Sequence, residues 1–274
     1  MSTKIQWCDE TWNPIVGCSK ISDGCMNCYA EKQASRGALQ QFKRYREVIT
    51  DGKWNGKFVF HRPTRYKPYH WKKPRNIFVC SMSDLFLHRI PFGIMKKIFA
   101  TIEDCPQHNF IVLTKRTGAM YRFFWAFKDK IDFGAMKNLW IGASVENNKH
   151  INRISNLCEI KKWIGIENLF VSLEPLLELI SYLSYHELKY DKYRLPLCVN
   201  AYLSDIKWVI VGGESGANAR PIKAEWVRII RDQCKKESVP FFFKQWGKYK
   251  KGNLLDGKKY EEFPEELINQ KENE

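Results

Sequence analysis

The sequence predicts an α/β protein built on a TIM-type barrel of mostly parallel strands, either a complete (β/α)8 barrel or a (β/α)6 barrel with additional strands. Short, continuously apolar runs recur along the chain, as is typical of strands buried on both faces of a parallel sheet. Stretches with helical periodicity separate several of these runs. An alternation of strands and helices favours a parallel α/β architecture.

Eight segments have the composition of strands, which fits a complete barrel in a chain of this length. The predicted strands span residues 11–17, 57–61, 77–81, 109–114, 139–143, 169–173, 208–212 and 239–243. The predicted helices between them include residues 92–104, 119–130, 149–162 and 223–238.

The domain prediction is a single barrel domain over residues 1–247, followed by a charged tail over residues 248–274. Two segments interrupt the strand–helix pattern. Residues 31–76 form a basic, aromatic insertion, and residues 178–205, rich in Tyr and Leu, are a possible lid. No run of about 18 apolar residues is present, and the first residues lack the apolar core of a signal peptide. We therefore expect a cytoplasmic protein with no membrane association.

The charge balance indicates a polyanionic partner. The formal net charge is +15, and residues 31–76 alone hold 13 Lys or Arg against 3 Asp or Glu. Aromatic residues are interleaved with these charges, so cations could meet phosphates while rings stack on bases. The alternative is that the charges are solvated and the rings pack the outside of the barrel. For nucleic-acid binding, the expected residues are Arg62, Arg65, Tyr66, Lys67 and Arg116.

Polar residues follow six consecutive apolar strands. These residues include Ser81, Ser83 and Asp84; Lys115 and Arg116; Ser144, Glu146 and Asn147; Glu174; Glu214; and Lys244. The carboxyl ends of parallel strands meet at one face of a barrel, where active sites are found. This pattern predicts a shared ligand site, although singly Glu174 could cap a helix. The Gly-rich residues 212–216 could form either an anion-binding turn or an ordinary tight turn.

The strongest chemical signal is a C-x6-C-x2-C pattern formed by Cys18, Cys25 and Cys28. Three thiolates on one loop can hold an iron–sulfur cluster with one open metal position, which reactive sites need. Two alternatives remain. A structural zinc site would need a distant fourth ligand such as Cys8 or His61, and the three cysteines could also be unliganded core residues.

The string TWNPIVGCSKISDGCMNCYAE resembles the signature of the phage-type three-Cys-motif proteins, a family of phage proteins of unknown function. The likeness continues through SMSDLF, LTKR, GASVEN, VSLEPLL, WVIVGGESG and VPFFFKQWG, so it covers nearly the whole chain. This family is similar to radical S-adenosylmethionine (SAM) enzymes. Within them it is similar to the spore photoproduct lyase group, which shares a Cys-x2-Cys-Tyr stretch like residues 25–29.

The resemblance implies a [4Fe–4S] cluster on Cys18, Cys25 and Cys28, with SAM at the open iron. Reduction by an external donor such as flavodoxin or ferredoxin would cleave SAM to a 5′-deoxyadenosyl radical. Tyr29, next to the third cysteine, is expected at the cofactor. By strand order, the residues expected at the SAM amine are Ser81, Ser83 and Asp84. Those expected at the ribose hydroxyls are Ser144, Glu146 and Asn147.

The leading hypothesis is therefore a radical SAM enzyme that modifies or repairs nucleic-acid bases, in DNA or tRNA. Its candidate catalytic residues are Glu214, Lys244 and Lys115. Two other hypotheses stay open: a non-catalytic nucleic-acid-binding protein stabilised by a metal or cluster, and a radical SAM enzyme acting on a peptide or small molecule. Only the last predicts no salt-dependent affinity for nucleic acid.

Overall fold

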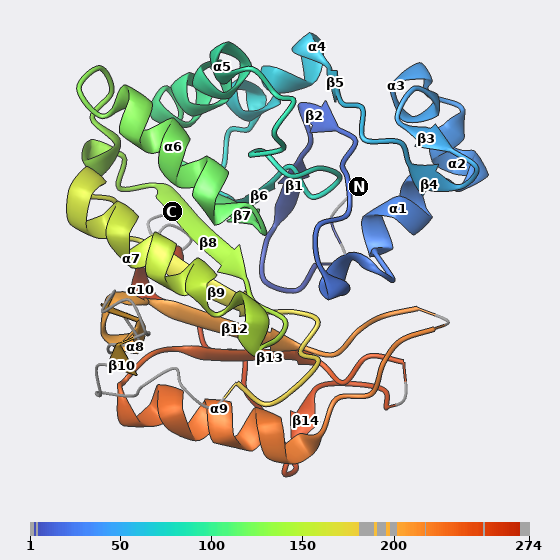
Figure 1. Ribbon diagram of the computed structural model, residues 1–274. Helices are drawn as coiled ribbons and strands as arrows, with labels where there is room; N and C mark the ends of the chain where they lie inside the picture. The colour runs from blue at the N-terminus through green and yellow to red at the C-terminus, as the bar shows by residue number, and fades with distance from the viewer. Residues whose placement is uncertain are drawn as a thin grey trace.

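The computed structural model is a mixed α/β fold around one curled, seven-stranded parallel sheet (Figure 1). It describes residues 3, 5–180, 189–190, 196–197, 202–216, 218–248 and 250–268. The strands are, in spatial order, β1 (Glu10–Trp12), β6 (Asn76–Val79), β7 (Asn109–Thr114), β8 (Leu139–Ser144), β9 (Leu169–Leu173), β12 (Trp208–Gly212) and β13 (Phe241–Gln245). All neighbours in this order pair in parallel.

The sheet is an open half-barrel, with β1 and β13 as its edges, so the predicted closed TIM-type barrel is not confirmed. The predicted strand at residues 11–17 is interrupted at Pro14, which has no N–H to donate to a ladder. It splits into β1 and a short β2 (Ile15–Val16). The predicted strand at residues 57–61 contributes only β5 (Val59–Phe60), which pairs antiparallel with β2 outside the main sheet.

Four amphipathic helices cover the convex face of the sheet: α5 (Phe92–Glu103), α6 (Thr117–Phe127), α7 (Asn152–Ile164) and α9 (Ala224–Lys236) (Figure 1). In α5 the buried residues include Met95, Ile98, Phe99 and Ile102, the spacing of one helical face. The Phe99 ring stacks on Phe123 of α6 with ring centroids 5.0 Å apart. The helical patterns in the sequence therefore correctly predict these helices, with small shifts at their ends.

The concave face of the sheet is filled by large aromatic side chains, and both chain ends close it. Its apolar cluster includes Phe78, Phe170, Trp208 and Phe242 from four strands. Trp7 from the N-terminal segment packs 4.7 Å from the Phe78 ring centroid. On the C-terminal side, the Trp208 indole donates a hydrogen bond of 2.9 Å to the Glu262 carbonyl. This packing leaves the carboxyl edge of the strands as the polar end of the fold.

The described part of the C-terminal tail belongs to the folded body. It contains β14 (Leu254–Leu255), β15 (Lys258–Lys259) and α10 (Glu265–Ile268). A bridge joins Phe242 to Glu261, and the Asn76 side chain donates 3.0 Å to the Leu267 carbonyl. Most of the possible lid at residues 178–205 lies outside the described residues, which hold β10 (Lys189–Tyr190), β11 (Pro196–Leu197) and α8 (Tyr202–Asp205) there.

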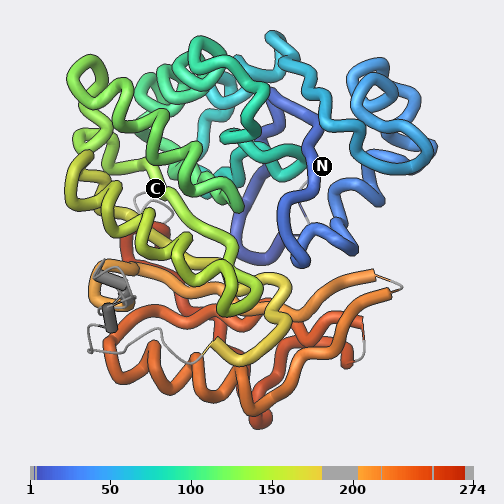
Figure 2. The backbone as a smooth tube through the Cα atoms, in the orientation of Figure 1, coloured from blue at the N-terminus to red at the C-terminus, as the bar shows by residue number. Residues whose placement is uncertain are grey.

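The basic, aromatic segment 31–76 is a chain of short elements at the β1 edge of the sheet (Figure 2). After α1 (Tyr29–Ala34) come α2 (Gly37–Gln40), α3 (Lys43–Arg46), β3 (Ile49–Thr50), β4 (Lys53–Trp54), α4 (Arg62–Arg65) and the 3-10 helix η2 (Lys67–His70). The remaining 3-10 turns are η1 (Asp23–Cys25), η3 (Phe133–Ala135) and η4 (Asn148–His150). Among the described helices, none is both long and apolar enough to cross a bilayer.

Candidate active site

A loop that carries all three clustered cysteines, residues 17–28 (hereafter the cysteine loop), lies at the carboxyl edge of the sheet. It begins where Gly17 bridges to Ser83, just beyond β6. The Ser83 hydroxyl donates 2.6 Å to the Gly17 carbonyl, and the Gly17 amide donates 3.1 Å to Met82. The loop ends at Cys28, which precedes α1. The loop therefore lies beside the residues that follow β6.

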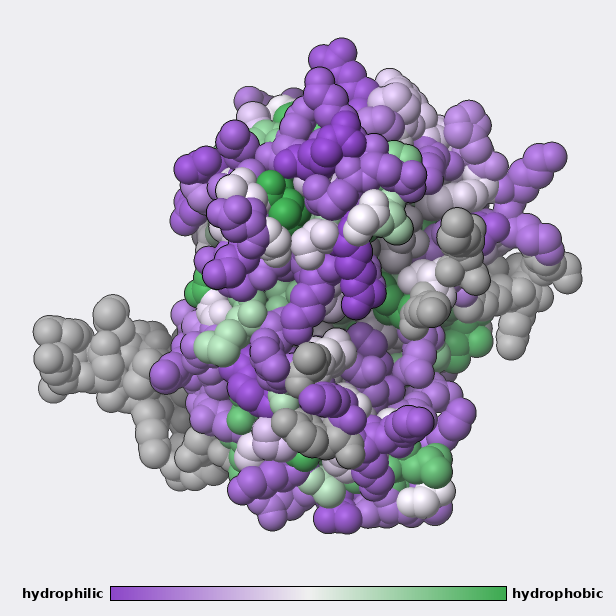
Figure 3. Space-filling view, turned by 90° about the vertical axis from the view of Figure 1, so that its right-hand side faces the viewer, coloured by the Kyte–Doolittle hydropathy of each residue, from purple (hydrophilic) through white to green (hydrophobic). Residues whose placement is uncertain are grey.

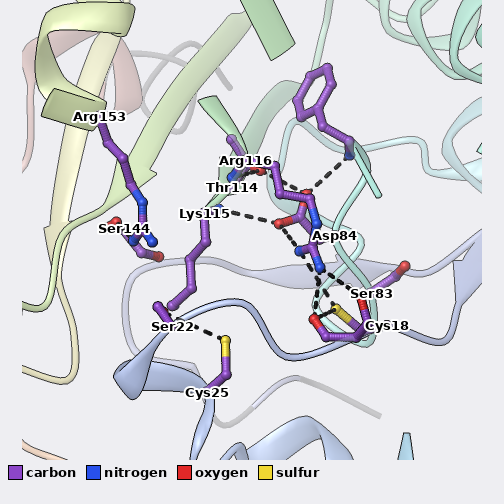
Figure 4. Close-up of polar contacts among 12 residues, drawn as sticks. Cys18, Ser22, Cys25, Ser83, Asp84, Thr114, Lys115, Arg116, Ser144 and Arg153 are labelled. Carbon is purple, nitrogen blue, oxygen red and sulfur yellow. Dashed lines mark hydrogen bonds and ion pairs between the residues drawn. The ribbon is translucent and has the colours of Figure 1, made fainter. Parts of the chain in front are cut away.

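The first part of the loop is held by the ion pair of Arg116 and Asp84 (Figure 4). Arg116 Nη1 lies 2.9 Å from Asp84 Oδ2 and 3.9 Å from Cys18 Sγ, and Nη2 donates 2.7 Å to the Ser19 carbonyl. Asp84 also accepts 2.7 Å from the Thr114 hydroxyl. Arg116 thus faces the cysteine loop, whereas its sequence-based assignment was to nucleic acid.

The Cys18 thiol is shielded at this position. Burial raises its pKa to about 12, and the charge of Asp84 acts in the same direction, while the Arg116 cation opposes them. The charges of Cys28 and Cys25 also act to raise the Cys18 pKa. Metal binding to Cys18 would therefore release its thiol proton.

The middle of the loop is held by Glu146, which lies just beyond β8 and is fully buried. Its Oε1 accepts 3.3 Å from the Gly24 amide, and its Oε2 pairs with Arg153 at 2.7 Å. A Cβ at Gly24 would lie 2.9 Å from the Glu146 carboxylate, so this approach requires glycine. Burial alone would raise the pKa of Glu146, but the positive charges of Lys115 and Arg153 hold it below its ordinary value.

The end of the loop is held by Glu214 in the turn after β12. Its carboxylate accepts 2.9 Å from the Asn27 side chain and pairs with Arg220. Arg220 Nη2 also donates 2.8 Å to the Asp23 carbonyl inside the loop. Burial would raise the pKa of Glu214, and hydrogen bonds from Arg220 and Asn27 instead keep it lowered.

Three buried acid–arginine pairs therefore anchor one loop from three different strand ends. The acid side chains of Asp84, Glu146 and Glu214 are only 8%, 0% and 4% exposed. Removing the arginine of such a pair leaves the charge of a buried acid uncompensated, so each pair defines the loop position strongly. Arg153, Arg220 and Asn27 were not among the residues predicted for the site, because none of them directly follows a predicted strand and the contacts of Arg220 and Asn27 across the loop span 197 and 187 residues.

The other predicted cofactor residues lie at the same edge of the sheet, and most of their polar groups form hydrogen bonds within the protein. The Tyr29 hydroxyl donates 2.9 Å to the Ser81 carbonyl, and the Ser81 hydroxyl donates 3.1 Å to Asn13. Asn147 donates 3.4 Å to Asp23, while its buried Oδ1 has no hydrogen-bond partner within the described residues. Ser144 is buried at the end of β8.

Two candidate catalytic lysines lie close to this edge. Lys244 pairs with Glu174 at 2.7 Å, and both are half-buried. Strand alternation places them on the concave face, beyond Phe242 and Phe170. Lys115 extends from the end of β7 toward the part of the cysteine loop that holds Ser22 and Cys25 (Figure 4). The structure therefore brings both lysines to the same end of the sheet as the cysteines.

The loop suits an iron–sulfur cluster in its donor chemistry. It presents three cysteine thiols, and Arg116 and Ser22 place N–H and O–H groups 3.9 and 3.8 Å from the sulfurs of Cys18 and Cys25. Within the described ranges, however, no three His, Cys, Asp or Glu side chains lie close enough together to hold a metal ion. A cluster would therefore have to draw the thiols together.

Cys8 and His61, the two residues considered as a fourth zinc ligand, both make contacts outside the cysteine loop. Cys8 is buried in the aromatic cluster of the concave face, where burial raises its pKa to about 12. His61 Nδ1 lies 2.6 Å from the Thr64 hydroxyl at the start of α4. Neither supports a four-ligand zinc site with the cysteine loop.

The predicted nucleic-acid residues Arg62, Arg65, Tyr66 and Lys67 lie in α4, at the start of η2 and at the junction between them, away from the cysteine loop. Arg65 Nε donates 3.1 Å to the Thr101 hydroxyl near the C-terminal end of α5. Because α5 runs antiparallel to the strands, this contact places α4 toward their amino ends (Figure 1). The Arg65 guanidinium lies 4.8 Å from the centroid of the exposed Tyr66 ring. The structure thus separates this patch from the candidate active site.

A family model described as "Protein of unknown function (DUF5131)" matches residues 2–264. The chain belongs to this family. The description of the family gives no activity, so it leaves open the expected relation to radical SAM enzymes and spore photoproduct lyases. No curated protein and no solved structure matches the chain.

Proposed function

We propose that this protein is a radical SAM iron–sulfur enzyme that modifies or repairs nucleic-acid bases. The observation that carries the proposal is the cysteine loop itself. Three thiols lie on one loop at the carboxyl edge of a parallel sheet, which is where α/β folds bind their ligands. Three acid–arginine pairs hold the backbone of this loop, so that its thiols remain available as ligands.

The proposed ligands of the cluster are Cys18, Cys25 and Cys28. When bound, a [4Fe–4S] cluster with SAM supplies one-electron chemistry that no side chain provides. The residues of the chain hold and shield this site. Arg116 donates toward Cys18, and N–H groups directed at cluster-ligating sulfur tune the reduction potential of iron–sulfur sites. The aromatic cluster on the concave face of the sheet, which includes Trp208 and Phe242, excludes water from that side of the site.

Proton transfer near the substrate is assigned to Lys244 and Lys115. Lys244 Nζ donates a hydrogen bond of 2.7 Å to Glu174 Oε1, which orients its ammonium group on the half-buried concave face. Glu214, by contrast, is fully engaged with Arg220 and Asn27. We therefore assign Glu214 a positioning role in place of the catalytic role that its sequence position suggested.

Nucleic acid is the proposed substrate class because of the charge distribution. The chain has a formal net charge of +15, and the exposed Tyr66 ring beside Arg65 is the kind of surface on which a base can stack. A polymer can contact this patch and the cysteine loop at once, which a small molecule cannot. Affinity that falls steeply with added salt would support this substrate class, and salt-independent binding would favour a peptide or small molecule.

The proposal is tested by SAM cleavage in the reduced, anaerobically reconstituted protein. Wild type and a Cys158→Ala control should release 5′-deoxyadenosine, because Cys158 lies on α7 outside the loop. Cys18→Ala, Cys25→Ala and Cys28→Ala should each abolish release. Equal release from the control and the three loop variants, or none from any protein with a full complement of iron, would reject the proposal.

One observation favours a second function. The cysteine loop is already fixed by three ion pairs, and no three metal-ligating side chains are gathered within the described residues. This arrangement would also suit a non-catalytic nucleic-acid-binding protein in which a metal or cluster only stabilises the loop. Such a protein would bind single-stranded nucleic acid equally well with and without SAM, and it would leave SAM intact.

A further inference from the structure

Lys32 presents a cation that is shielded from solvent and has no hydrogen-bond partner among the residues that the structure describes. It lies on α1, one helical turn after Cys28, whose carbonyl accepts the Lys32 amide at 3.2 Å. Its Nζ is buried and makes no hydrogen bond within the described residues. An ammonium group has three N–H donors, and shielding it from water without a partner costs free energy. Such a residue is expected where a ligand completes its contacts.

The nearby carboxylates are committed to other groups. Glu31, the preceding residue, pairs with Lys20 at 2.8 Å and accepts 3.0 Å from the Trp54 amide. Glu214, in the turn that faces Lys32, pairs with Arg220. Neither acid is therefore available to neutralise the Lys32 ammonium.

The ammonium lies directly against the turn after β12. A Cβ at Gly216 would lie only 2.8 Å from Lys32 Nζ, and Gly216 has a φ of +103°, which favours glycine. Ser215 and Gly216 are exposed, and within the described part of the chain their amides donate to no backbone carbonyl. Successive free amides in such a turn form a concave site for anions.

We propose that Lys32 and the amides of Ser215 and Gly216 bind an oxyanion, a carboxylate or phosphate group of a ligand that docks at the carboxyl edge of the sheet. The flexible four-carbon stem of lysine lets Nζ turn toward an anion held by the two amides. The face of the molecule shown in Figure 3 is mainly hydrophilic. The inference does not depend on the cysteines holding a cluster.

The test is a titration of the full-length protein with inorganic phosphate at constant ionic strength, followed by NMR at the Ser215 and Gly216 amides. Lys32→Met keeps the stem and removes the charge. Lys43→Met removes one charge from a side chain that is 82% exposed in the same basic segment, and it serves as the control. We expect saturable shifts in wild type and control, and at least tenfold weaker binding in Lys32→Met. Equal binding in all three proteins, or no shift at these amides in wild type, would overturn the site.

Thermal unfolding without phosphate separates a binding role from a structural one. Lys32→Met should unfold at the same temperature as wild type or higher, because it removes a shielded charge without a partner. A clearly lower temperature would instead make Lys32 a structural residue and contradict the proposal.

The source of the anion is identified by competition in wild type. Displacement of phosphate by SAM, but not by decarboxylated SAM, assigns the site to the carboxylate of SAM. Displacement by a single-stranded oligonucleotide, but not by a nucleoside, assigns it to a phosphate of nucleic acid. Because these measurements need no cluster, their failure is distinguishable from failure of the proposed enzymatic activity. If neither SAM nor the oligonucleotide displaced phosphate, the site would not bind the ligands of the proposed enzymatic activity.

Discussion

Glu214 and Asn27 are separated by 187 residues in the chain, yet the Asn27 side chain donates a hydrogen bond of 2.9 Å to the Glu214 carboxylate. Arg220 completes the contact by pairing with Glu214 and donating to the Asp23 carbonyl. Through these bonds the turn after β12 fixes the end of the cysteine loop. Equivalent roles belong to Asp84 and Glu146 at two other strand ends.

Glu214→Gln should destabilise the protein by about 1–3 kcal/mol, because it leaves the Arg220 cation without its buried acid. Urea unfolding measures the change. Glu47→Gln, which removes an exposed acid paired with Lys43, is the control and should change stability little. If both variants lost the same small amount, the Glu214–Arg220 pair would not anchor the loop.

Arg116→Lys should release the first part of the loop. Lysine has a single Nζ, which does not reproduce the two separate guanidinium nitrogens that bond Asp84 and the Ser19 carbonyl. Cys18 should then react faster with a thiol reagent. The rate is measured by mass spectrometry of the labelled peptide. Arg122→Lys, at an exposed position of α6, should leave the rate unchanged. An unchanged rate in Arg116→Lys would mean that the loop does not rely on this contact.

Gly24→Ala should displace the middle of the loop, since the added methyl group would lie 2.9 Å from the buried Glu146 carboxylate. We expect lower stability in urea and weaker retention of iron after reconstitution. Gly37→Ala is the matched control, because a Cβ there meets no atom within 4 Å. Equal iron content in the two variants would contradict the close contact between Gly24 and Glu146.

Acid should weaken the anchoring of the loop. The pKa values of Glu146 and Glu214 are lowered in the folded protein, so each contributes stability that is present above the unfolded pKa, near 4.5. That contribution is lost as the pH falls below 4.5 through the lowered folded values. The urea midpoint should therefore drop between pH 6 and pH 3.5, and less steeply in Glu214→Gln. Parallel pH profiles for wild type and Glu214→Gln would argue against this linkage.

The sequence predicts the central strands well because a strand buried on both faces consists mostly of consecutive apolar residues. Residues 109–114 and 169–173 are continuous apolar runs, and both are strands of the main sheet. Residues 57–61 have similar β-forming side chains, but their pairing partner is the short β2 beyond Pro14, so they lie outside the main sheet. Strand propensity alone does not specify a partner.

In the candidate site, too, short sequence patterns can be predicted, whereas contacts between residues far apart in the chain cannot. The cysteine spacing and the polar strand ends are visible in the sequence, and the structure brings them together. The partners of the acids are not visible. Arg220 follows Glu214 closely in the chain, but its bond to Asp23 spans 197 residues. Likewise, Arg65 and Tyr66 belong to the basic, aromatic segment that follows the loop in the sequence, whereas in the structure Arg65 contacts Thr101 near the C-terminal end of α5.

The central claim, that Cys18, Cys25 and Cys28 hold a SAM-responsive cluster, is tested most directly by anaerobic iron and sulfide analysis. It is combined with electron paramagnetic resonance of the reduced protein, with and without SAM. The account predicts about four irons and four sulfides per chain, and a signal that SAM perturbs. Zinc in place of iron, or a cluster signal unaffected by SAM, would contradict it and favour the non-catalytic binding protein.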